Sequence, residues 1–91
     1  MSELIKVVSA RAVSDTAIHV VFSNGTEGVR DYGDLLAEGG PMVEPLRDPA
    51  FFRRVFVSYG VPTWPNGFDV DAINLHDELR ERGLLRRANA A

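Results

Sequence analysis

The sequence predicts a small α+β domain: an N-terminal β-meander, short helices, a further β-hairpin and a C-terminal helix. Three observations carry this prediction. Apolar and polar residues alternate through the N-terminal third, where Asn24-Gly25 interrupts the alternation. The period changes after Tyr32, and Gly and Pro become frequent. A last segment begins with Asp71 and ends at Gly83, as a capped helix does. Residues 1–85 are therefore predicted to be a single α+β domain, and residues 86–91 a flexible basic C-terminal tail.

The first three strands are expected at residues 4–13, 17–22 and 26–32. In the first, strict alternation would put Val7 and Ala10 on opposite faces. The second strand is expected to bury Ile18, Val20 and Phe22 together at period two.

Asn24-Gly25 predicts a tight hairpin between the second and third strands. Both central residues of a type I′ turn need φ > 0, which Gly adopts freely and Asn tolerates. A two-residue loop would pair Ser23 with Thr26, and therefore Val20 with Val29 on the same face.

The middle of the chain predicts short helices and a second hairpin. Asp34 is expected to cap a single turn that ends at residues 39–41, Gly-Gly-Pro. Asp48 at N-cap and Pro49 at the first helical position predict a helix of about two turns, to Arg54. Residues 55–59 and 61–64 are expected to be strands, with Gly60 between them and a turn at residues 65–67, Pro-Asn-Gly.

The C-terminal helix is expected to start at the N-cap Asp71. Its buried side would hold Leu75 and Leu79, with Ala72 and Ile73 filling the same side. Gly83 is expected in the left-handed conformation, with the contact between Leu79 and Leu84 that accompanies a Schellman motif. Glu78 and Arg82 form an i,i+4 pair.

The amino-acid composition argues against several classes of function. The 91 residues contain no cysteine, which excludes disulfides, thiolate nucleophiles and cysteine metal sites. No signal peptide or membrane span is visible, so we expect a bacterial cytoplasmic protein without a membrane partner. Six basic and twelve acidic residues precede position 80, and four arginines follow, so direct nucleic-acid binding by the acidic body is not expected.

No motif predicts catalysis, a cofactor or a metal. His19 and His76 are the only imidazoles, and no partner ligand or nucleophile is close to either in sequence, although a long-range contact stays open. Asn66, Asp69 and Asp71 lack the continuation of a calcium loop, and turn and N-cap roles account for them. We therefore expect no catalytic, cofactor-binding or metal-binding residue, and a protein that is not an enzyme.

Trp64 has two interpretations. In the first it fills the core of a domain that needs its largest apolar side chain for burial. In the second it belongs to an exposed aromatic patch that binds a partner. The candidate partner-binding residues are Tyr59, Trp64, Phe68, Arg86 and Arg87.

The order of motifs resembles the small bacterial proteins of the domain-of-unknown-function 2442 family. The matching pieces include VVFSNGTEGVRDYGDLL, GGPMVEPLRDPAFFRRVFV and TWPNGFDVDAINLHDEL. The resemblance implies a compact α+β fold and no catalytic residues. Some relatives carry a following DNA-binding domain, and others stand beside a second small protein in pairs similar to toxin–antitoxin pairs.

Three functional hypotheses follow. The first is a non-enzymatic interaction module, an antitoxin-like or accessory member of a small operon pair, whose partner is another small protein or a second copy in a homodimer. The second is a nucleic-acid-associated regulator that uses the arginine tail from Arg80 to Arg87, while a partner supplies base readout. The third is an enzyme, for which the sequence offers no activated nucleophile or acid–base pair.

Overall fold

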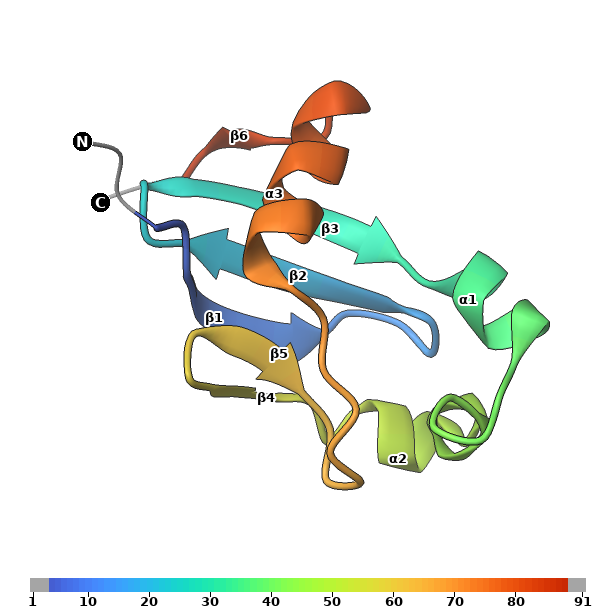
Figure 1. Ribbon diagram of the computed structural model, residues 1–91. Helices are drawn as coiled ribbons and strands as arrows, with labels where there is room; N and C mark the ends of the chain where they lie inside the picture. The colour runs from blue at the N-terminus through green and yellow to red at the C-terminus, as the bar shows by residue number, and fades with distance from the viewer. Residues whose placement is uncertain (1–3, 89–91) are drawn as a thin grey trace.

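The computed structural model describes residues 4–88, which form two antiparallel β-sheets and a set of helices (Figure 1). In chain order the elements are β1 (Val7–Ala12), β2 (Ala17–Phe22), β3 (Thr26–Asp31), α1 (Gly33–Glu38), the 3-10 helix η1 (Glu44–Arg47), α2 (Pro49–Phe52), β4 (Phe56–Ser58), β5 (Val61–Thr63), α3 (Ala72–Glu81) and β6 (Arg86–Arg87). The larger sheet has the strand order β1-β2-β3-β6, and β4 pairs with β5 in the smaller one. The predicted α+β class is confirmed.

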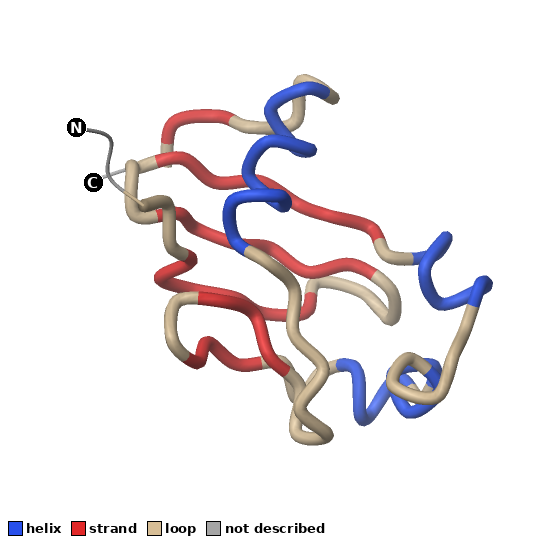
Figure 2. Tube along the Cα trace, viewed as in Figure 1, coloured by secondary structure: helices blue, strands red, loops and turns tan. Residues whose placement is uncertain are grey.

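The core lies between the larger sheet and α3. This helix crosses one face of the sheet, while the shorter helices gather at one end (Figure 2). Period-two alternation in β2 places Ile18, Val20 and Phe22 on the covered face, as predicted, and each is at most 1 % exposed. Leu75 and Leu79 of α3 belong to the same buried cluster.

A β-bulge in β1 overturns one prediction of strict alternation. The register shifts between Val7 and Ser9, so Val8 is the extra residue and its side chain is exposed. Ala10 then returns to the core side with Val7 and does not lie on the opposite face. The strand also begins at Val7, later than expected.

The hairpin between β2 and β3 lies at Asn24-Gly25, but its register is one residue away from the predicted one. Val20 pairs with Gly28, and His19 pairs with Val29, so the loop has three residues. The Gly25 N–H donates to the Phe22 carbonyl at 3.1 Å, and Gly25 has φ +85°. This is a turn followed by a left-handed glycine and not a type I′ turn. Because the side-chain period is two, the slip exposes Val29.

A turn with φ > 0 at both central residues joins β4 to β5 instead. Ser58 pairs with Val61, and between them Tyr59 has φ +51° and Gly60 has φ +76°. Tyr59 is fully exposed, at 101 % of its reference area. A tyrosine at such a position is strained, because its Cβ crowds the backbone there.

Acidic N-caps start two of the three α-helices. The Asp48 carboxylate accepts from the Ala50 N–H at 3.0 Å, and Asp71 accepts from the Asn74 N–H at 2.9 Å, as predicted. The helix after Asp48 ends at Phe52, earlier than Arg54. Asp34 is not a cap: it lies in the first turn of α1, which follows Tyr32.

The end of α3 is the predicted Schellman motif. Gly83 has φ +71°, its N–H donates to Arg80, and the Leu84 N–H donates to Leu79 at 2.8 Å. The prediction for Ile73 is wrong, since this side chain is 40 % exposed. Ile73 lies about 100° around the helix from Ala72, and the buried side of the helix holds His76 instead.

Trp64 is part of the core, which confirms the first interpretation. It is fully buried and its Nε1 donates to the Phe52 carbonyl at 2.9 Å. The rings of Tyr32, Phe52 and Phe68 lie 5.7–6.4 Å from the indole, centroid to centroid.

The predicted boundary of a flexible tail at residue 86 is also corrected. Arg86 and Arg87 form β6, which pairs with Thr26 and Glu27 of β3. The Ala88 N–H donates to the Gly25 carbonyl at 2.7 Å. The rest of the predicted tail, residues 89–91, lies outside the described residues.

Candidate functional site

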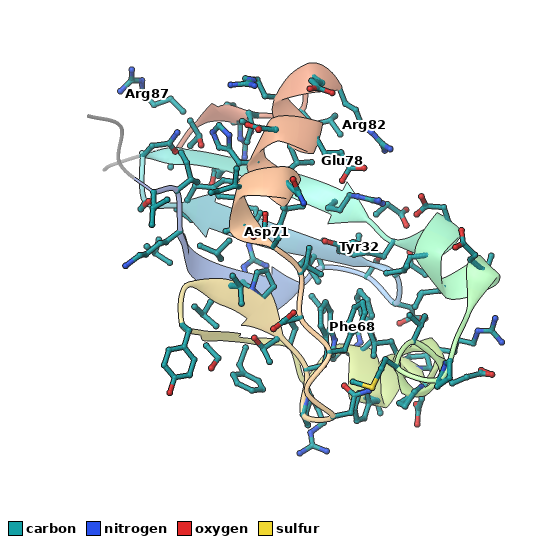
Figure 3. All side chains as sticks on the ribbon, viewed as in Figure 1. Tyr32, Phe68, Asp71, Glu78, Arg82 and Arg87 are labelled. Carbon is teal, nitrogen blue, oxygen red and sulfur yellow. The ribbon has the colours of Figure 1, made fainter. Side chains whose placement is uncertain are left out.

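A cleft of about 480 Å³ opens between α1, α3 and the segment that enters α3. We call it the acidic groove. Its apolar lining consists of Leu35, Phe68, Val70 and Leu75, and its charged lining consists of Arg30, Asp34, Glu38, Asp69 and Glu78, with Tyr32 and Asn74 completing it. Figure 3 shows Tyr32, Phe68 and Glu78 on the side of α3 that faces α1. The volume lies within the roughly 300–1,000 Å³ typical of ligand sites.

Arg30 organises one wall of the groove. It projects from β3 to the covered side of the sheet and is only 8 % exposed. Its Nε donates to Glu78 Oε1 at 2.9 Å, and its Nη1 donates to Asp34 Oδ1 at 3.1 Å and to the Asp31 carbonyl. Burial opposes the charge of Arg30, but the hydrogen bonds to the two carboxylates outweigh it and raise the pKa of the guanidinium. The same contact lowers the pKa of Asp34.

Tyr32 lies behind this network. The Arg30 guanidinium carbon is 4.5 Å from the centre of its ring, a cation–π contact. The side chain is 4 % exposed, and its hydroxyl is buried without a hydrogen-bond partner. Burial raises the pKa of Tyr32, so the phenol stays protonated. A buried hydroxyl in this state costs about 1–3 kcal/mol until something bonds to it.

The outer rim of the groove carries negative charge that the protein does not neutralise. Asp34 and Glu78 are occupied by Arg30, and Glu78 also pairs with Arg82 at 3.1 Å. Glu38 and Asp69 are exposed, and neither forms an ion pair with any other described residue. Two of the four carboxylates are therefore paired with arginines and two are not, beside an apolar lining. This arrangement can bind a group that is both cationic and apolar.

The structure does not bring the five predicted partner-binding residues together. Phe68 lines the acidic groove and packs against the buried Trp64, which itself is inaccessible. Tyr59 stands alone at the tip of the β4–β5 turn. Arg87 lies on β6, at the far end of the molecule from Phe68 (Figure 3).

Arg86 belongs to a second network, on the sheet face opposite α3. Its Nε donates to Glu27 Oε2 at 2.9 Å, and Glu27 Oε1 lies 3.0 Å from His19 Nε2. The hydrogen bond with His19 lowers the pKa of Glu27, and Arg86 adds to the effect. The Arg86 side chain is 77 % exposed, so its pair with Glu27 lies at the surface.

His76 is buried rather than exposed. Its Nε2 lies 3.1 Å from the Asn24 amide nitrogen, and its Nδ1 lies 3.3 Å from Asp77 Oδ1. The ring meets Phe22 edge-on at 5.1 Å. Neither imidazole lies in the acidic groove. Within residues 4–88, no group of three or more His, Cys, Asp or Glu residues could hold a metal ion.

Sequence reasoning missed Arg30 and Tyr32. In the predicted register Val29 faces the core, and Arg30 would face solvent. Gly28 could have indicated the register of β3. A Cβ at this position would lie 2.9 Å from the Leu84 carbonyl oxygen, so glycine leaves the room that this carbonyl needs. A glycine inside a strand commonly marks such a close approach.

In a comparison with known protein families, the chain matches one family model. The model of the family described as "Protein of unknown function (DUF2442)" covers residues 7–81. No curated protein and no solved structure matches the chain. Among the helices of residues 4–88, none has the length and apolar character needed to cross a membrane.

Proposed function

This chain belongs to the DUF2442 family, and we propose that it is a non-enzymatic interaction module that holds a segment of a partner protein in the acidic groove. In this proposal it is the antitoxin-like or accessory member of a pair of small proteins. The observation that carries it is the groove itself, an open cleft of about 480 Å³ with an apolar lining and unneutralised carboxylates.

Hydrogen bonds from Arg30 connect the elements that border the groove. Arg30 ties β3 to α1 through Asp34 and to α3 through Glu78. The Arg30 side chain is 9 % exposed, whereas Asp34 is 67 % exposed and Glu78 33 % exposed. Charge-assisted contacts of this kind favour the observed arrangement of the walls. Preorganisation of this kind reduces the entropy lost on binding.

The perturbed groups in the groove support binding rather than acid–base catalysis. An efficient general acid or base has a pKa near the working pH. Here the pKa of Asp34 is lowered and those of Arg30 and Tyr32 are raised, each away from neutrality. These groups keep one protonation state near pH 7, which suits recognition.

The alternative of a nucleic-acid-associated regulator receives less support. Phosphate binding needs cations that are free to pair. Arg86, one of the four arginines in residues 80–87 expected to serve it, is already paired with Glu27.

Site-specific photo-cross-linking tests the proposal. A photo-reactive p-benzoylphenylalanine replaces Asn74, inside the groove, or Arg11, on the opposite face of the sheet. After irradiation in an extract of the source cells, we expect one defined protein cross-linked through position 74. That protein is then purified and added back to confirm a direct complex. Cross-links from position 11 with none from position 74 would remove the groove from the binding surface.

A further inference from the structure

The geometry points to the class of side chain that the groove recognises: we infer that it binds a lysine or arginine of the partner, flanked by apolar residues. This inference rests on the proposed function and names the partner's chemistry. It depends on three independent features of the groove: charge, shape and an unpartnered hydroxyl.

Charge selects a cation. Arg30 is shared between Asp34 and Glu78 and cannot neutralise the remaining rim. Glu38 on α1 and Asp69 on the segment before α3 stand on two elements that border the same cleft. A cation between these walls faces carboxylates from both sides, whereas an anionic side chain would be repelled by Glu38 and Asp69, which pair with no described cation.

The apolar lining selects a cation on a long apolar stem. Leu35, Phe68 and Val70 are half-buried and leave part of their surface in the cleft. Lysine and arginine pack their methylene stems on such a surface and keep the charged head at the polar rim. A small inorganic cation would leave this lining uncovered.

The Tyr32 hydroxyl supplies a buried acceptor. It is a neutral phenol whose oxygen has no partner, and Tyr32 is one of the residues lining the cleft. The hydroxyl oxygen is fully buried under the side chains that line the cleft. Ammonium and guanidinium groups have only donors, so a cationic head group that displaces those side chains would supply the missing bond. The Arg30 guanidinium lies over the face of the same ring and makes no hydrogen bond to its hydroxyl.

An NMR titration with defined peptides tests this inference. The probes are N-acetyl-Leu-Arg-Leu-amide and the same peptide with citrulline, a neutral arginine analogue of nearly identical shape. We expect the arginine peptide to shift the backbone amides of Glu38, Asp69 and Asn74 in the ¹⁵N-labelled protein. We expect the citrulline peptide to bind at least tenfold more weakly.

Charge-removing variants complete the test. Glu38→Gln combined with Asp69→Asn is expected to weaken the arginine peptide at least fivefold. Glu81→Gln removes another exposed charge, outside the groove, and is expected to leave the affinity for the arginine peptide unchanged. Equal affinity for the two peptides would overturn the inference, and so would absence of any shift at the groove amides. Neither result would affect the cross-link through Asn74, which tests the proposed function separately.

Discussion

Replacing Trp64 tests the structure of the core most severely. The indole is fully buried, contacts three aromatic rings and donates to the Phe52 carbonyl at 2.9 Å. Trp64→Ala leaves a cavity, which typically costs about 3–5 kcal/mol. It also leaves the carbonyl without its donor, a penalty of about 1–3 kcal/mol that overlaps with the first. At about 0.05–0.15 kcal/mol per residue, the free energy of unfolding of a chain of 91 residues is roughly 5–14 kcal/mol.

Urea denaturation followed by circular dichroism measures the effect, because the variant loses the only tryptophan and with it the fluorescence signal. With a slope of about 1–3 kcal/mol per molar urea, the Trp64→Ala midpoint should fall by at least about 1 M, or the protein should be unfolded in water. Trp64→Phe keeps an aromatic ring and should remain folded with a smaller loss. Tyr59→Ala removes an exposed ring and should stay within about 0.5 kcal/mol of wild type. A Trp64→Ala protein with the wild-type midpoint would refute a core role.

Three further predictions concern the turns and the second network. Gly25→Val should destabilise by about 1–3 kcal/mol, because valine is strained at φ +85° although nothing lies within 4 Å of its Cβ, and an unchanged midpoint would contradict the observed turn. Tyr59→Asn should increase the free energy of unfolding by up to about 1 kcal/mol, because asparagine tolerates φ > 0 better than tyrosine. A higher thermal midpoint would show this. Because folding lowers the pKa of Glu27, its ionised carboxylate stabilises the protein above the ordinary pKa of 4.5. This stabilisation is lost as the pH falls through the lower pKa of the folded state. In thermal melts, the midpoint of Glu27→Gln should therefore fall less steeply than that of wild type below about pH 4.5.

Local signals predicted the parts of the fold that depend on neighbouring residues. The N-caps Asp48 and Asp71 and the left-handed Gly83 are fixed by contacts within about four positions of the chain. The burial of Ile18 and its neighbours in β2 follows from alternation alone. None of these features needs information from elsewhere in the fold.

Long-range contacts decided what the sequence could not predict. The register of β3 depends on Gly28, whose missing side chain admits the chain after α3, and that contact joins residues more than fifty positions apart. The pairing of Arg86 with Glu27 places residues that were predicted to be a flexible tail in β6, and this contact too joins residues far apart in the chain. Charge density and a terminal position made residues 86–88 resemble a free segment.

The candidate site was hidden by the same register error. Phe68 was a candidate partner-binding residue, and it lines the acidic groove. Arg30 was assigned to the solvent side, and its partner Glu78 was recognised only through the local pair with Arg82. A groove made from β3, α1 and α3 exists only once those elements pack, so spacing along the chain could not indicate it.

Hydrogen–deuterium exchange can locate the partner-binding surface on the protein. The measurement compares the free protein with its complex with the purified partner found by cross-linking through Asn74. If the acidic groove is the binding surface, protection should increase in residues 30–38 and 68–78, which border it. Exchange around His19 and Val29, on the opposite face of the sheet, should not change. Protection confined to that opposite face, with the groove segments unchanged, would contradict the account.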